Sequence, residues 1–190
     1  RSLSGPPNKA GPRRRRSHVS TSTMLSMLVS SYGTSLEIFA LTLLGAIPLG
    51  VLIVIGRLSK FRPLSLLMQL LISVMRGTPL MLQMFAVFFV PFYVFGIQTG
   101  TDYMFTAVII AFVINYAAYF AEIYRSGIQS MPQGQYEAAL VLGYSHAQTF
   151  FRIILPQVVK RILPAMGNEV ITLVKDTSLA FSIGIIEMFT

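Results

Sequence analysis

The sequence predicts an all-α protein, a polytopic bundle of transmembrane helices. Of its 190 residues 54% are hydrophobic and only 12% are charged, and the mean hydropathy is +0.66. A soluble domain normally carries about a quarter of its residues charged. The apolar residues are gathered in long charge-free stretches, and Lys and Arg gather at the ends of those stretches. Together these observations predict membrane spans.

Four spans are expected in chain order. Crossing a bilayer core takes about 20 mostly apolar residues in a helix. Charge-free stretches of this length cover residues 38–56, 77–101 and 103–121, and only Arg76 separates the second from uncharged residues 64–75. A fourth span is expected over residues 163–183, although Glu169, Lys175 and Asp176 interrupt it. Charged residues in a span face other helices rather than lipid.

The positions of Lys and Arg predict the orientation, because loops on the cytoplasmic side carry an excess of both. Arg57, Lys60 and Arg62 crowd the link after the first span, which is therefore placed in the cytoplasm. The connection over residues 96–102 has no positive charge and is placed outside. Residues 122–161 return to the cytoplasm, since four Lys and Arg side chains follow the third span: Arg125, Arg152, Lys160 and Arg161.

The net charge of +8 is concentrated in an N-terminal tail. Residues 1–23 hold six Lys and Arg and no acid, while residues 24–190 hold nine against seven acids. Rich in Pro, Gly, Ser and Arg, the tail is expected to be disordered. Met24 is a natural start, so we expect residues 1–23 not to be native to the protein. A genuine arm that binds anionic lipid or nucleic acid is the alternative.

Catalytic and cofactor motifs are missing from the sequence. There is no cysteine, and His18 and His146 lie too far apart for a metal site. Neither a phosphate-binding Gly-x-x-x-x-Gly-Lys-Ser/Thr loop nor a nucleophile–base pair occurs. We therefore expect no catalysis, no metal and no bound cofactor in this chain.

The strongest signal is a motif in the segment 122–161. Glu137-Ala138-Ala139 is followed after three residues by Gly143, after nine more by Ile153, and then by Leu155-Pro156. Two short helices are expected, over residues 134–142 and 146–155. Gly143 can adopt backbone conformations closed to other residues, so it is expected to separate the two helices. Pro156 is expected to end the second helix. The small alanines suit a helix that packs into another protein's groove.

This spacing, EAA-x3-G-x9-I-x-LP, resembles the EAA loop of ABC importer permeases at every fixed position. Residues 76–80, 118–135 and 167–180 look like the polar amino-acid subfamily, and the resemblance covers roughly residues 34–190. It implies a type I ABC importer permease fold, in which this loop is the coupling helix and sits in a cleft of a separate ATPase subunit. In that role we single out Glu137, Ala138, Ala139, Gly143, Ile153, Leu155 and Pro156.

The resemblance also implies the partners. The chain is expected to form half of a pathway for a polar amino acid, completed by a second permease copy or a paralogue, in a bacterial inner membrane. ATP and Mg²⁺ are expected in the partner ATPase, and an extracytoplasmic binding protein delivers the solute; no nucleic acid is involved. The family's five-span core needs one more helix beyond Thr190, so we expect the chain to be truncated at its C-terminus.

Other polar residues near the spans are candidates for gating or transport. Pro79 is expected to kink or end a helix, and Gly77 permits close helix packing. With Arg76 and Thr78 these residues are assigned to anchoring and kinking the second span, or to gating. A solute path is assigned to Asn115, Glu169, Lys175 and Asp176. Lipid and interface contacts are assigned to six aromatics: Phe85, Phe88, Phe89, Phe92, Tyr93 and Phe95.

Two other classes remain open. A gradient-driven secondary transporter or channel needs coupling acids deep in its spans, and the first three spans have charge-free apolar cores. A structural membrane protein without transport leaves the loop motif unexplained. Dependence of transport on ATP hydrolysis separates an ABC permease from both.

Overall fold

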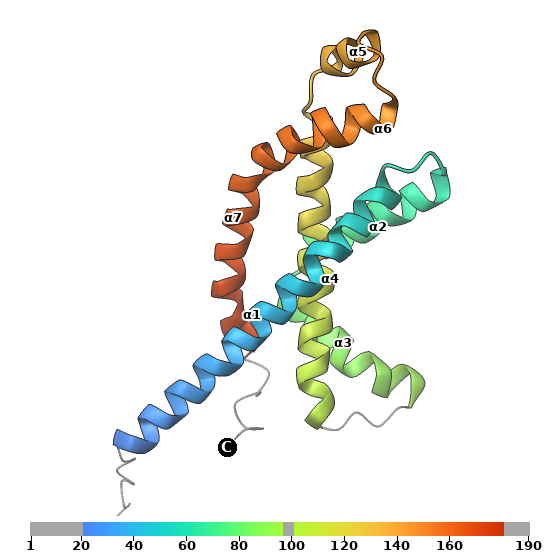
Figure 1. The fold of residues 1–190 in the computed structure, drawn as a ribbon. Coiled ribbons are helices and arrows are strands. Elements are labelled where there is room, and N and C mark those ends of the chain that lie inside the picture. The colour runs from blue at the N-terminus through green and yellow to red at the C-terminus, as the bar shows by residue number, and fades with distance from the viewer. Residues whose placement is uncertain (1–20, 97–100, 181–190) are drawn as a thin grey trace, which may run out of the picture.

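The computed structural model describes residues 21–96 and 101–180, and this part of the chain is helical with short connections (Figure 1). Three helices form the first half: α1 (Thr21–Arg57), α2 (Arg62–Gly77) and α3 (Leu80–Phe95). The long α4 (Thr101–Gln129) leads to the short α5 (Gln133–Val141) and α6 (His146–Gln148). A π-helical segment, η1 (Thr149–Ile154), then joins α6 to α7 (Leu155–Ala180).

Within the described residues, α1 and α4 are long and apolar enough to cross a membrane. Together, α2 and α3 pass the same test, but they are bent by 112° at the break between Gly77 and Leu80. The predicted second span is therefore a broken one, and its residues 97–100 lie outside the described part. Because α7 carries Asn168, Glu169 and Lys175 in its middle and last turns, it is not among the helices that pass. Its predicted extension to residue 183 also lies outside the described part.

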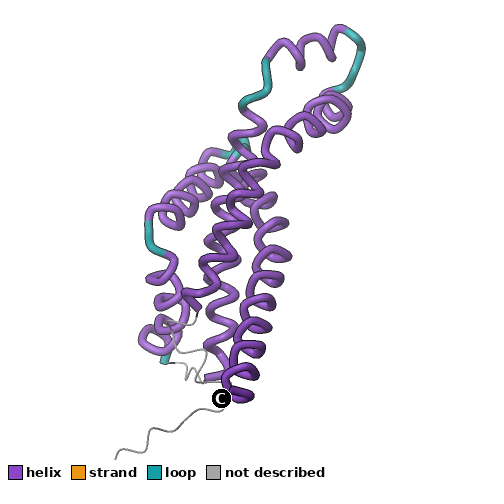
Figure 2. Tube along the Cα trace, turned by 90° about the vertical axis from the view of Figure 1, so that its left-hand side faces the viewer, coloured by secondary structure: helices purple, strands orange, loops and turns teal. Residues whose placement is uncertain are grey.

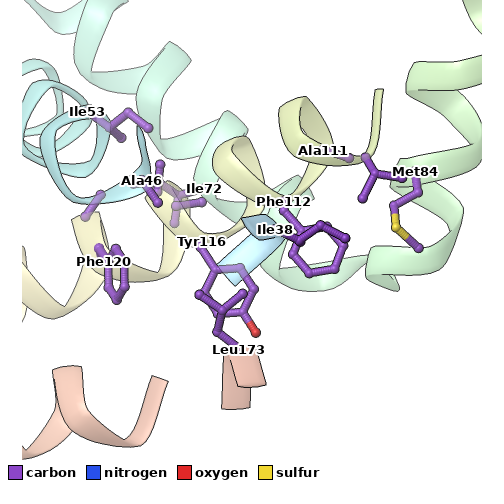
Figure 3. Packing of buried hydrophobic residues seen from close by; sticks show 14 of the residues in the cluster. Ile38, Ala46, Ile53, Ile72, Met84, Ala111, Phe112, Tyr116, Phe120 and Leu173 are labelled. Atoms are coloured by element: carbon purple, nitrogen blue, oxygen red, sulfur yellow. The ribbon is translucent and has the colours of Figure 1, made fainter. Parts of the chain in front are cut away.

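Most of the core is built where α1 crosses α4. Figure 3 shows Phe112, Tyr116 and Phe120 of α4 against α1 residues such as Ile38 and Ala46, all nearly or fully buried. Gly50 permits this close approach, because a Cβ atom there would lie 3.0 Å from Phe120 Cβ and 3.1 Å from the Ala117 carbonyl oxygen. Small residues at helix crossings let backbones approach in just this way in membrane bundles.

The segment between α4 and α7 projects beyond the bundle as a separate loop (Figure 2). The loop with α5 lies toward the same end of the molecule as the α1–α2 link, whereas the last turns of α3 and the first turns of α4 lie toward the other end (Figure 1). Both connections predicted to be cytoplasmic thus share one end. The arrangement agrees with the orientation expected from the Lys and Arg positions.

Two predicted boundaries need correction. Helix α1 begins at Thr21, so the last three residues of the predicted tail, 21–23, are helical; residues 1–20 lie outside the described part. Pro156 does not end a helix, because η1 runs directly into α7 and Pro156 is the second residue of α7. The π-helical hydrogen bond from Leu155 N–H to the Phe150 carbonyl shifts the pairing by one residue just before the proline, which has no N–H to donate.

Candidate functional site

The turn between α5 and α6 is built around Gly143. This residue has a φ of +80°, in the left-handed region where a side chain is strained. Backbone N–H groups of Leu142, Gly143 and Tyr144 donate to the carbonyls of Ala138, Leu140 and Ala139 at 3.0–3.1 Å, which satisfies the end of α5. The predicted break at Gly143 is confirmed, and α5 spans nearly the predicted residues.

A capping box starts the second arm of the loop. The Ser145 hydroxyl accepts a hydrogen bond from Gln148 N–H at 3.3 Å, and the Gln148 Oε1 atom accepts one from Ser145 N–H at 2.9 Å. Such reciprocal bonds pair donors that a helix start otherwise leaves unpaired. The Thr149 hydroxyl adds a bond of 3.0 Å to the Ser145 carbonyl. The loop thus has a defined conformation on both sides of Gly143.

Three contacts fix the loop to the bundle. The Arg161 guanidinium of α7 donates to the Ser130 carbonyl at 2.6 Å and to the Ser130 hydroxyl at 2.9 Å. The Gln157 amide donates to Gln135 Oε1 at 2.6 Å. Met131, Ile154 and Val158 form a small buried apolar cluster beneath these bonds. Polar and apolar contacts together therefore connect the loop to α7.

The motif residues divide between an inward and an outward side. Ala139 is 1% exposed and Ile153 and Leu155 are half-buried, whereas Glu137, Ala138, Gly143 and Pro156 are exposed. The outward side also carries large apolar side chains that occupy variable positions of the motif: Leu140, Val141, Leu142 and, on η1, Phe151. Val141 is 88% exposed, and nothing in the sequence around it predicts that this apolar side chain faces outward.

Pro79 divides α2 from α3, as predicted, and a buried amide pair closes the gap. The Gln83 amide nitrogen donates to the Met75 carbonyl at 2.9 Å, to the Thr78 carbonyl at 3.1 Å and to the Thr78 hydroxyl at 2.8 Å. Asn115 of α4 donates to the same Met75 carbonyl at 3.1 Å and to Gln83 Oε1 at 3.0 Å. Sequence reasoning missed Gln83, which lies in an otherwise apolar stretch.

Arg76, one turn before the break, lies over a ring of α4. Its guanidinium carbon is 5.2 Å from the centroid of Tyr119, a cation–π geometry. The single ion pair among the described residues joins Arg125 to Glu122, so no described carboxylate lies within ion-pair distance of Arg76. Both Arg76 and Gly77 are exposed in the chain alone.

A cavity of about 400 Å³ lies beside Arg76, between α4 and α7. Its charged lining consists of Arg76, Glu122, Arg161 and Glu169, with Tyr119, Ser126 and Ser130 as further polar groups. Two positive and two negative groups surround the cavity. Of the residues assigned to a solute path, Glu169 lines it, and Asn115, Lys175 and Asp176 do not.

The other path candidates lie elsewhere. Asn115 is buried at the α2–α3 break, and the Asp176 carboxylate accepts a hydrogen bond of 2.7 Å from the Tyr116 hydroxyl, which joins α7 to α4. Lys175 is exposed on α7. The aromatics Phe89, Phe92, Tyr93 and Phe95 of α3 are exposed, as expected of lipid-facing side chains. In the described part of the chain no group of three His, Asp or Glu is placed to hold a metal ion.

Comparison with known proteins extends over most of the chain. Residues 22–190 match the family described as binding-protein-dependent transport system inner membrane component. The L-cystine transport system permease proteins TcyB and TcyL of Bacillus subtilis (strain 168) are each 41% identical, over 74% and 81% of this chain. The matches cover 58% and 66% of those relatives, so this chain spans less than two thirds of their length.

A solved structure with the same arrangement is that of an amino acid ABC transporter with histidines. It superposes with a TM-score of 0.77 at 34% identity, over 88% of this chain and 78% of the other. The methionine ABC transporter MetNI, in an inward-facing conformation, has a TM-score of 0.62 at 20% identity, which supports the fold alone.

Proposed function

We propose that this chain, which belongs to the family of binding-protein-dependent transport system inner membrane components, is the permease subunit of an ATP-driven importer for polar amino acids. In this proposal the chain forms half of the translocation pathway. A second permease copy or a paralogue supplies the other half, and an extracytoplasmic binding protein delivers the solute. ATP and Mg²⁺ bind to a separate ATPase.

The observation that carries the proposal is the outward side of the loop around α5. Glu137, Ala138, Val141 and Leu142 are exposed on a segment that projects from the bundle. Exposed apolar side chains gathered with a carboxylate are typical of a protein–protein contact. This surface is at the end of the molecule predicted to be cytoplasmic, where an ATPase would be reached.

The loop is also connected to the helices that a transport cycle must move. Arg161 and Gln157 link the loop to α7, and Ser130 is one residue beyond the end of α4. Closure of the ATPases on ATP would pull the loop and shift α4 and α7 with it. ATP can shift the permease between two conformations only if the complex makes different contacts in each of them. In this proposal the loop makes those contacts with the ATPase.

The cavity beside Arg76 is the proposed place for the solute within this half of the pathway. Since Glu122 is already paired with Arg125, its other charged groups, Glu169, Arg76 and Arg161, offer partners for both ends of an amino-acid zwitterion. Glu169 is the proposed partner of the solute's ammonium group. Lys175 and Asp176 remain candidates further along the path because they are charged residues of α7, and Asn115 remains one because it is a polar residue within α4.

A disulfide cross-link tests the proposal, because the chain has no native cysteine. A single cysteine replaces the exposed Ser145 beside the Gly143 turn, and the ATPase carries single cysteines along the cleft expected to receive α5. Membranes are then oxidised with and without ATP. A nucleotide-sensitive cross-link supports the permease assignment and the docking surface. If no cleft position cross-links while both folded proteins are present, the coupling role is rejected; Ser35→Cys on α1 is the matched control.

A further inference from the structure

A second polar cavity, of about 250 Å³, lies on the other side of Arg76. It is an open pocket lined by α1, α2 and α4, and its polar lining consists of Arg57, Gln69, Ser73, Arg76, Glu122 and Arg125. Arg57 is the last residue of α1, and Arg125 lies in the last turns of α4. Both belong to the end predicted to be cytoplasmic, so this cavity leads from the level of Arg76 toward the cytoplasm.

One face of α2 supplies the wall of this cavity. Gln69, Ser73 and Arg76 are spaced at i, i+4 and i+7, which places them on the same side of the helix. Exposed Leu67 lies on the opposite side of α2. A polar stripe on a membrane helix is costly beside lipid and is favourable beside water or a polar solute.

The charges of the cavity do not balance. Glu122 forms an ion pair with Arg125 and also accepts a hydrogen bond of 2.9 Å from the Nε atom of Arg125. Arg57 is held by neutral groups: it donates to the Ser65 hydroxyl at 3.1 Å, and that hydroxyl donates to the Arg57 carbonyl at 2.8 Å. Arg76 lies over Tyr119. Three fixed guanidinium groups thus surround one carboxylate, and the lining keeps two uncompensated positive charges.

We propose that this cavity is an exit site that accepts the carboxylate of the solute on its way to the cytoplasm and disfavours cationic amino acids. The inference rests on the proposed transport function and adds a selectivity to it, namely for neutral and acidic amino acids. Arg76 lines both cavities. It can therefore hold a carboxylate while the solute passes from the cavity between α4 and α7 to this one. Guanidinium groups suit this role because they bind carboxylates through two parallel hydrogen bonds.

The experiment uses the complete permease–ATPase complex in nanodiscs without the binding protein, so that only the permease selects. Equilibrium binding of radiolabelled glutamate, glutamine and arginine is measured. We expect glutamate to bind at least tenfold more tightly than arginine. Arg57→Gln is expected to weaken glutamate binding at least tenfold, and Arg57→Lys to weaken it less than Arg57→Gln does, because lysine keeps the charge but loses the two parallel hydrogen bonds. Arg62→Gln, which removes a charge outside the cavity, is expected to change nothing.

ATP-driven uptake by the complex with its binding protein separates the two proposals. If no amino acid is taken up, the proposed function fails. If uptake is normal and arginine binds to the nanodisc complex as tightly as glutamate, the exit site is rejected while the function stands. The exit site is also rejected if Arg57→Gln leaves glutamate binding unchanged. It is rejected as well if none of the three amino acids binds. The comparison of glutamate with arginine on the unaltered protein decides the question even if Arg57→Gln does not fold.

Discussion

The side-chain amide of Asn115 on α4 donates a hydrogen bond of 3.0 Å to Oε1 of Gln83 on α3 and one of 3.1 Å to the Met75 carbonyl on α2. In an unbroken helix that carbonyl would pair with the N–H of residue 79, but Pro79 has none. The two amides therefore both donate to the one carbonyl, that of Met75, which the proline leaves unpaired. This pair fixes the place where α2 ends and the 112° bend begins.

Replacing either amide is expected to destabilise the protein. Asn115→Leu leaves the buried Gln83 Oε1 atom without its donor. Gln83→Leu removes an acceptor from the buried Asn115 amide and the donor from the Thr78 carbonyl. A lost partner of a buried polar group costs about 1–3 kcal/mol. We expect a lower Tm for each variant, measured by circular dichroism of the purified protein. Because both side chains serve one network, the double variant should lose less than the sum of the single losses. Gln133→Leu, on the exposed start of α5, is the control, and fully additive losses would contradict a shared network.

The contact between Tyr116 and Asp176 gives a second prediction. The 2.7 Å bond joins the buried face of α4 to the last turns of α7, and a hydrogen bond to a charged group contributes about 1.5–3 kcal/mol. Tyr116→Phe is expected to lower the free energy of unfolding by an amount in this range. The change should be much smaller when Asp176→Leu, which removes the acceptor, is already present. Equal effects of Tyr116→Phe with and without Asp176→Leu would show that the bond contributes nothing.

Thr42 gives a prediction of the opposite sign. Its hydroxyl is fully buried between α1 and the core and has no hydrogen-bond partner among the described residues. Burying an unpaired hydroxyl costs about 1–3 kcal/mol by protein mutational data. Thr42→Val keeps the shape and removes the hydroxyl, so we expect the Tm to rise. Thr34→Val, at an exposed position whose hydroxyl bonds to the Ser30 carbonyl, should not raise it. A lower Tm for Thr42→Val would contradict a cost of burying this hydroxyl.

Much of the fold follows from local sequence signals. Charge-free length predicts α1 and α4, Pro79 predicts the break after α2, and Gly143 predicts the turn after α5. These features depend on one residue or on a run of similar residues, so no tertiary contact is needed to foresee them. Their energetic causes are the missing N–H of proline, the freedom of glycine and the cost of charge in lipid.

The remaining features depend on contacts between helices. Asn115 was assigned to a solute path because it is a polar residue in a span, but its partners are 32 and 40 residues away in the sequence. Nothing local distinguishes Gln83 from a lipid-facing glutamine. Pro156 was expected to end a helix, since the π-helical shift of η1 that accommodates it is invisible in composition. Glu169 alone of the path candidates lies in the cavity beside Arg76.

The last prediction concerns coupling. Gly143→Asp and Glu137→Lys change the charge of the outward side of the loop without touching the core, so membrane insertion should be unchanged. Uptake is expected to fall at least tenfold, about 1.4 kcal/mol of lost coupling, while ATP hydrolysis by the complex continues. Gly143→Asn is the matched control, because asparagine tolerates the left-handed conformation as aspartate does but adds no charge. Normal uptake by both charged variants in the full complex would remove the loop from the transport cycle.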